Sequence, residues 1–105
     1  MAKRFKDQTP APGSAAALRR DIEELRLGQP NYELMSTELA NVTRRQLTGF
    51  KEMIAQLGAV DSVTFKGVGP DDADIFEVKF EHGSTEWRIK MESEEKIASV
   101  SLRRL

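Results

Sequence analysis

The stretch from Asp74 to Met91 alternates apolar and polar residues with a period of two. That period gives a β-strand one apolar and one solvated face. His82-Gly83 lies between two such runs, and glycine tolerates the positive φ that tight hairpin turns require. The stretch therefore predicts a β-hairpin that turns at His82-Gly83. The predicted pairs are Val78 with Trp87, Phe76 with Ile89, Lys79 with Glu86, and Glu77 with Arg88.

A strand is predicted on each side of this hairpin. Residues 60–68 alternate in the same way, and the turn-rich stretch 67–74 separates them from the hairpin. Residues 96–104 alternate after a predicted turn at Ser93-Glu94, in a register that places Trp87 opposite Val100. The expected inward side chains on the outer two strands are Val63, Phe65, Ala98, Val100 and Leu102.

Two helices are predicted before the strands. Apolar residues at helical spacing indicate a helix over 14–27, with Ser14 as N-cap and Gly28 past its end. A broader apolar stripe indicates a longer helix over 37–57, with Ser36 as N-cap. Gly49 inside this second helix is expected to permit close packing on the sheet.

The predicted fold class is α+β, with two N-terminal helices followed by a four-stranded antiparallel meander. A sheet with one apolar face needs one cover, and we expect the long second helix to supply it. Residues 14–105 form a single predicted domain. Residues 1–13, which contain Pro10 and Pro12, are expected to be a disordered lead or linker.

Composition excludes several function classes. The chain has 16 Lys and Arg, 17 Asp and Glu, and no cysteine, so we expect no nucleic-acid partner and no thiol chemistry. No apolar run is long enough for a bilayer, so no membrane partner is expected. Residues 1–14 lack the apolar core of a signal peptide. This pattern is typical of a cytoplasmic protein, or of a periplasmic or secreted one if the sequence is a mature fragment.

The stretch GVGPDDADIFEVKFEHGSTEWRI, Gly67 to Ile89, resembles small bacterial domains of the cystatin-like or nuclear-transport-factor-like superfamily. Such domains occur alone or appended to serine hydrolases of the beta-lactamase type. The order of elements, with helices before a curled antiparallel meander, is also similar. The resemblance implies a cystatin-like fold. It carries no catalytic residue over to this chain, although the superfamily includes isomerase-like enzymes.

The residue types that often form metal or phosphate sites in other proteins are interpreted here as turn residues. His82 is the only histidine and is expected to be a turn residue, which excludes multi-histidine metal sites. Asp71, Asp72 and Asp74 do not have the spacing of a calcium loop and are expected to form a solvated turn. Gly67 to Pro70 is expected to be a turn because no helix start follows it. We therefore predict no cofactor and no metal.

Two hypotheses about function remain. The preferred one is a non-catalytic module that binds a partner protein or itself as a homodimer, because every strand Asp and Glu is expected on the solvated face. Its predicted contact surface is the charged sheet face, namely Glu77, Lys79, Glu86, Arg88 and Lys90. The alternative is a small apolar-ligand binder or isomerase-like enzyme, with a pocket between the second helix and the sheet. The candidate pocket residues are Tyr32, Phe50 and Trp87.

Overall fold

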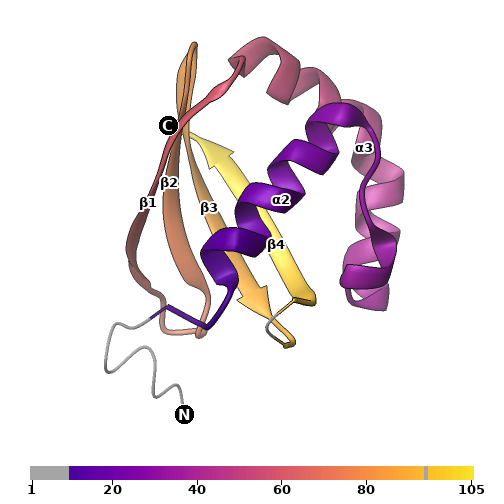
Figure 1. The fold of residues 1–105 in the computed structure, drawn as a ribbon, viewed down its shortest axis with the longest axis vertical. Coiled ribbons are helices and arrows are strands. Elements are labelled where there is room, and N and C mark those ends of the chain that lie inside the picture. The colour runs from indigo at the N-terminus through magenta and orange to yellow at the C-terminus, as the bar shows by residue number, and fades with distance from the viewer. Residues whose placement is uncertain (1–9, 94) are drawn as a thin grey trace.

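The structure is a computed structural model that describes residues 10–93 and 95–105 (Figure 1). The predicted disordered lead falls mostly on residues 1–9, which lie outside the described residues, as does Glu94 of the predicted second turn. Two helices precede four strands, so the predicted α+β class and element order are confirmed. The elements are α2 (Ser14–Leu27), the short 3-10 helix η1 (Tyr32–Leu34), α3 (Thr37–Leu57), β1 (Val60–Val68), β2 (Asp74–Phe80), β3 (Gly83–Met91) and β4 (Ile97–Arg104).

The helix ends follow capping chemistry, with one difference from the prediction. The side chain of Ser36 accepts a hydrogen bond from the amide of Leu39 at 3.1 Å and caps α3, as predicted. Gly28 ends α2 in a left-handed conformation with φ of 73°, also as predicted. At the start of α2, however, the N-cap is Gly13 and not Ser14. Ser14 is the first helical residue, and its side chain is buried.

The four strands form one antiparallel sheet in the order β1-β2-β3-β4. The predicted hairpin register is wrong by two residues, because the structure pairs Phe76 with Trp87 and closes the hairpin at Phe80 and Gly83. A shift of two leaves every side chain on its predicted face, so the alternation survives while each partner changes. The predicted ion pairs across the hairpin are lost, since Glu77 lies opposite Glu86.

Gly83 also differs from the prediction, because it lies in a strand and not in the turn. The turn residues are Glu81 and His82, and Gly83 is already the first residue of β3, without a positive φ. A Cβ atom on Gly83 would lie 2.9 Å from a terminal carbon of Leu57 at the end of α3. Glycine is therefore needed here for close packing between α3 and β3. The sequence interpretation attributed the same residue to the turn conformation.

The register between β3 and β4 also differs by two residues from the prediction. Trp87 lies opposite Leu102, where Val100 was expected. An irregularity follows Lys90, and the first residue of β4, Ile97, is buried at 1% exposure. Val100 and Leu102 remain on the helix side and pack against the core.

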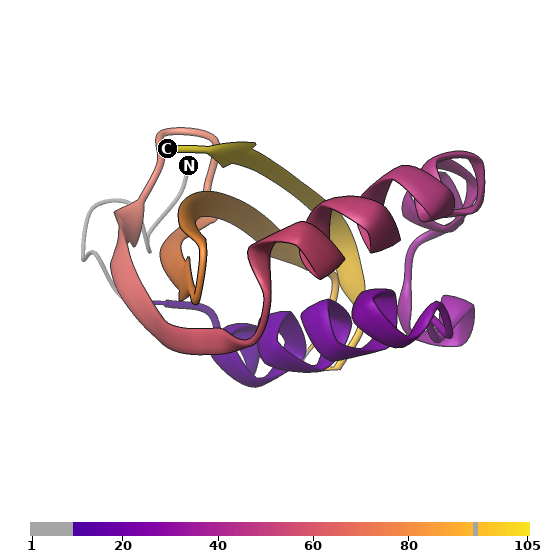
Figure 2. The same cartoon turned by 90° about the horizontal axis from the view of Figure 1, so that it is seen from above.

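Both helices pack on the apolar side of the sheet, but the strands that each helix contacts differ from the prediction. The helix that crosses the sheet is α2, which contacts β1 and β3, whereas α3 contacts α2 and β4 (Figures 1 and 2). Cover by the long second helix is thus not confirmed. Gly49 makes no close contact, since nothing lies within 4 Å of a Cβ atom built on it. The largest fully buried apolar side chains are Leu18, Ile22, Ile54, Leu57, Val78, Trp87, Ile89 and Ile97.

Candidate functional site

The sheet face that points away from the helices, here called the outer face, carries the five residues predicted as an interaction surface. Glu77, Glu86 and Arg103 lie in one cross-strand row. Side chains two residues apart on a strand share a face, so the predicted residues of β2 and β3 all lie on the same face as this row. The structure therefore brings the predicted set together, and it adds Arg103, which sequence reasoning did not select. The cross-strand register was the missing information.

The carboxylates of the outer face are less exposed to solvent than the cations that pair with them. Glu86 accepts a hydrogen bond at 3.1 Å from Nε of Arg103 and lies 3.6 Å from Nε of Arg88. The side chain of Glu86 is 20% exposed, against 45% for Arg88 and 69% for Arg103. Glu77 is 26% exposed and lies 3.7 Å from the ammonium of Lys66, which is 54% exposed. Hydrogen bonding from Arg103 also lowers the pKa of Glu86.

The balance of charge on the outer face is positive. Lys79 and Lys90 have no acidic partner among the residues that the structure describes. Five cations thus stand with two carboxylates, an excess of three positive charges, while the whole chain carries a net charge of -1. The cations are Lys66, Lys79, Arg88, Lys90 and Arg103, and the carboxylates are Glu77 and Glu86.

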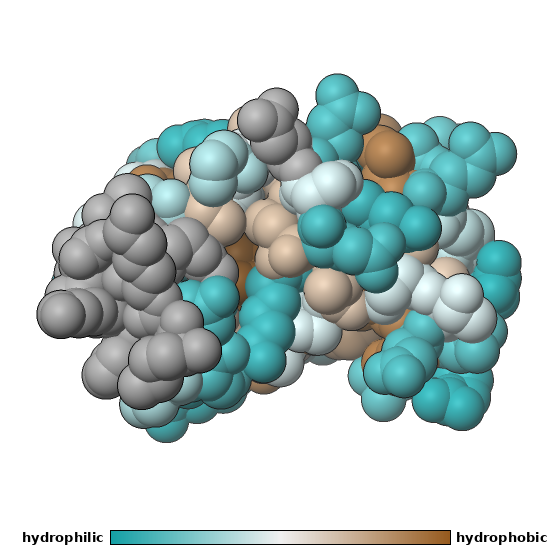
Figure 3. Space-filling view, turned by 90° about the horizontal axis from the view of Figure 1, so that it is seen from below, coloured by the Kyte–Doolittle hydropathy of each residue, from teal (hydrophilic) through white to brown (hydrophobic). Residues whose placement is uncertain are grey.

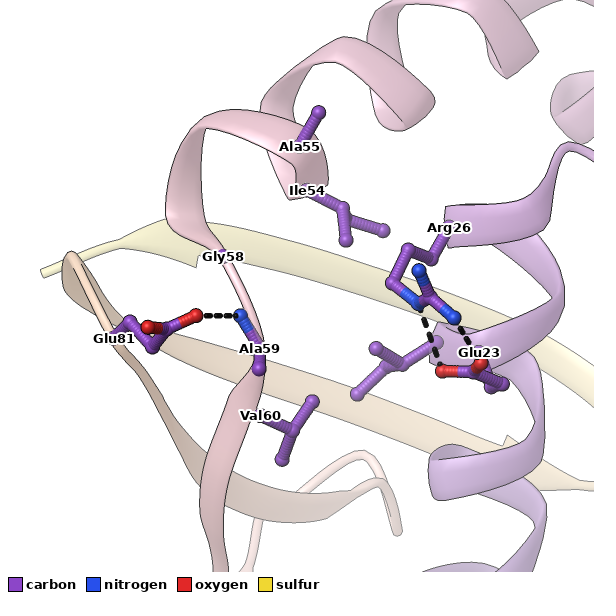
Figure 4. A pocket seen from close by; sticks show the side chains of 9 residues that line it. Glu23, Arg26, Ile54, Ala55, Gly58, Ala59, Val60 and Glu81 are labelled. Carbon is purple, nitrogen blue, oxygen red and sulfur yellow. Dashed lines mark hydrogen bonds and ion pairs between the residues drawn. The ribbon is translucent and has the colours of Figure 1, made fainter.

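A cleft of about 740 Å³ opens between α2, the end of α3 and the start of β1 (Figure 4). Its apolar lining includes Ile22 and Ile54, which are each 1% exposed. The polar groups at its rim are already paired within the molecule. Arg26 Nε donates a hydrogen bond of 3.0 Å to Glu23, which lowers the pKa of that carboxyl. Glu81 accepts a hydrogen bond of 2.9 Å from the amide of Ala59.

The three candidate pocket residues do not line one pocket. Trp87 is fully buried, and its indole nitrogen donates a hydrogen bond of 2.7 Å to Oγ1 of Thr85. Tyr32 lies in η1, where the guanidinium of Arg44 sits 4.3 Å from the centre of its ring. Phe50 lines a shallow groove of about 450 Å³ between α3 and β4, together with Arg45, Gln46, Gly49, Met53 and Leu102.

Two carboxylates among the described residues, Asp74 and Asp21, are buried. The burial of Asp74 corrects the expectation that all strand carboxylates face solvent. Asp74 is the first residue of β2 rather than part of a solvated turn, and it is fully buried on the same side as Phe76. Its Oδ2 accepts a hydrogen bond of 2.8 Å from the amide of Ala11, just before α2. The period of two that identified Phe76 already placed Asp74 on the inner face.

Asp21 is the second buried carboxylate and was missed. It lies on the buried side of α2, three residues after Leu18 and four before Leu25, so its spacing alone could have found it. The side chain is 1% exposed, and neither oxygen has a hydrogen-bond partner among the described residues. Burial, with a smaller contribution from Glu24, raises its pKa to about 6.

Large apolar side chains are scarce on the described surface. Only Leu27, Val60 and Leu105 are exposed, at 51%, 38% and 64%. The view from below in Figure 3 shows hydrophobic residues in small patches among hydrophilic ones. No helix in the described residues is both long and apolar enough to span a bilayer.

The remaining candidates for chemistry lie apart from one another. His82 and Asp71 are exposed in separate turns, and no group of metal-binding side chains occurs in the described part of the chain. The chain matches no protein-family model, no curated protein and no solved structure.

Proposed function

We propose that this domain is a non-catalytic binding module that contacts a partner protein through the outer face. One observation carries this proposal: on the side of the sheet opposite α2 and α3, the paired cations Lys66, Arg88 and Arg103 are more exposed than the carboxylates they contact, and Lys79 and Lys90 have no acidic partner among the described residues. Exposed charge that is not neutralised by neighbours is available to steer and orient a partner. The scarcity of exposed apolar residues favours a polar and reversible contact over a permanent one.

A selection from a random peptide library tests this proposal without a known partner. Peptides enriched on the wild-type domain are measured again on the double variant Lys79→Glu/Lys90→Glu. The matched control is Arg19→Glu/Arg45→Glu, which changes the net charge equally on exposed positions of the two helices. We expect binding to be lost in the first variant and kept in the second. No enrichment, or binding that survives the first variant, would contradict the proposal.

A second candidate function is the binding of a small apolar ligand in the cleft of Figure 4. Its volume of about 740 Å³ falls within the range of known ligand pockets, roughly 300–1,000 Å³. The enzyme version of this candidate, an isomerase-like activity, needs an ionisable group at the cleft. Asp21, whose carboxyl is the one with a raised pKa among the described residues, is not among the lining residues, so a binder is the stronger form.

We also propose the cystatin-like architecture for this fold. The supporting features are the helical start, the antiparallel meander that follows it and a helix lying across one face of a curled sheet (Figure 2). Fold-level likeness does not choose between the two candidate functions, because the same fold carries many of them. The choice rests on the outer face and the cleft.

A further inference from the structure

We propose that the partner of the outer face is an acidic protein segment. This inference rests on the proposed function and names the chemistry of the partner. The first support is the difference in exposure between the cations and the carboxylates of the face. Arg88 and Arg103, which both pair with Glu86, expose 45% and 69% of their side chains, whereas Glu86 exposes 20%. The surface therefore presents itself as cationic although carboxylates lie within it.

The second support is the cross-strand neighbour of three of the five cations. Lys79 lies opposite Ser84, Arg88 opposite Ser101, and Lys90 opposite Ser99. A serine is too short to cover a neighbouring ammonium or guanidinium group, and its hydroxyl donates to carboxylate oxygens. Each of these three cations thus lies beside a second, neutral hydrogen-bond donor. This pairing suits carboxylates, which accept several hydrogen bonds at once.

The same face argues against two other occupants. Single-stranded nucleic acids are held by aromatic side chains on which bases stack. The aromatic residues of the described strands, Phe65, Phe76, Phe80 and Trp87, all point to the helix side, where Phe65 and Phe76 contact each other at 5.5 Å. A second copy of the chain would bring two cationic faces together, which like-charge repulsion disfavours.

The test uses fluorescence anisotropy with three labelled probes, two peptides of equal length and one oligonucleotide. These are a peptide that alternates glutamate with serine, the same peptide with lysine in place of glutamate, and an oligodeoxythymidine with the formal charge of the first peptide. We expect the glutamate peptide to bind, and the lysine peptide not to bind. Affinity for the glutamate peptide should fall about tenfold or more in Lys79→Glu/Lys90→Glu, and should fall far less in Arg19→Glu/Arg45→Glu.

Amide spectra of the labelled domain locate the contact. Shifts confined to the four strands support the inference, and shifts on the helices overturn it. Tighter binding of the oligonucleotide than of the glutamate peptide also overturns it, because phosphate recognition would then explain the face better. If library peptides depend on the outer face but carry no excess of acidic residues, this inference fails while the proposed function stands. If no library peptide depends on that face, the proposed function itself fails.

Discussion

At the scale of single residues, the most consequential side chain is Asp21. An ionised carboxylate without a hydrogen-bond partner is costly in an apolar interior. Burial accordingly raises the pKa of Asp21 from 3.8 to about 6, with a smaller contribution from Glu24 and an opposing one from Arg20. Below pH 3.8 the carboxyl is protonated in both the folded and the unfolded chain. As pH rises to 6 the unfolded chain loses this proton first, so the stability of the fold decreases.

The variant Asp21→Asn tests this sign. A pKa difference of this size corresponds to at most about 3 kcal/mol at neutral pH. Because the amide carries no charge, we expect the variant to be more stable than the wild type at pH 7 by ~1–3 kcal/mol and nearly equal to it at pH 4. Urea unfolding across this range measures the difference. The control Glu52→Gln removes an exposed charge from α3 and should change little. A variant that is less stable at pH 7 would refute the argument.

Thr85 is a second residue whose role the structure defines. Its hydroxyl accepts a hydrogen bond from the indole nitrogen of Trp87 and donates one of 3.1 Å to the carbonyl oxygen of Val78. Thr85→Val keeps the shape but leaves the buried indole nitrogen without an acceptor. We expect a loss of ~1–3 kcal/mol in the free energy of unfolding. Denaturant unfolding followed by Trp87 fluorescence measures it. Thr64→Val on an exposed strand position is the control, and an equal effect there would contradict the prediction.

At the scale of elements, the alternation of the strands was predictable and their partners were not. A period of two assigns Phe76 and Trp87 to one face in any register shifted by an even number of residues. The alternation cannot choose among those registers, and Gly83 illustrates why: it lies in β3 beside Leu57, a residue of a different element. The face of the alternating residues of β2 and β3, and so their membership of the outer face, could therefore be read from the sequence, whereas the burial of Ile97 after the irregularity at Lys90 could not. The row that joins Glu86 to Arg103 could not be read from it either.

The prediction of which helix covers the sheet was not confirmed, for a similar reason. The broad apolar stripe of α3 suggested the cover of the sheet, yet α2 crosses it. An apolar stripe tells how much surface a helix buries but not which neighbour it meets. Side chains such as Leu47, Phe50 and Met53 are only partly buried, since α3 packs mainly on α2 and, within the sheet, on β4.

Gly49 gives a prediction at this scale. It lies in the interior of α3, its residue is exposed, and nothing approaches within 4 Å of a Cβ atom built there. Alanine at such a position restricts the unfolded chain and favours the helix. We expect Gly49→Ala to stabilise the fold by ~0.5–1 kcal/mol in denaturant unfolding. Gly83→Ala is the matched contrast and should destabilise it, because of the 2.9 Å approach to Leu57. The same sign for both variants would show that packing does not distinguish the two glycines.

At the scale of the whole molecule, the net charge of the chain does not report how its charges are distributed over the surface. A net charge of -1 predicts no preference for any charged partner. The fold nevertheless gathers five cations and only two carboxylates on the outer face. The acidic residues outnumber the basic ones by 17 to 16 in the chain, so the excess of negative charge must lie elsewhere. Only the folded arrangement separates the two signs.

This separation predicts how the domain behaves with itself. Two outer faces repel each other when the screening of charge is weak, so sedimentation equilibrium at low ionic strength should give a monomer. The charge-reversed variant Lys79→Glu/Lys90→Glu, mixed with the wild type, should give a weak heterodimer under the same conditions, because one face has then changed sign. Added salt should abolish that heterodimer within the range where the Debye length falls to about 10 Å or less. A wild-type homodimer that tightens as salt is removed would contradict this account, since attraction between identical faces requires accessible charges of both signs on each face.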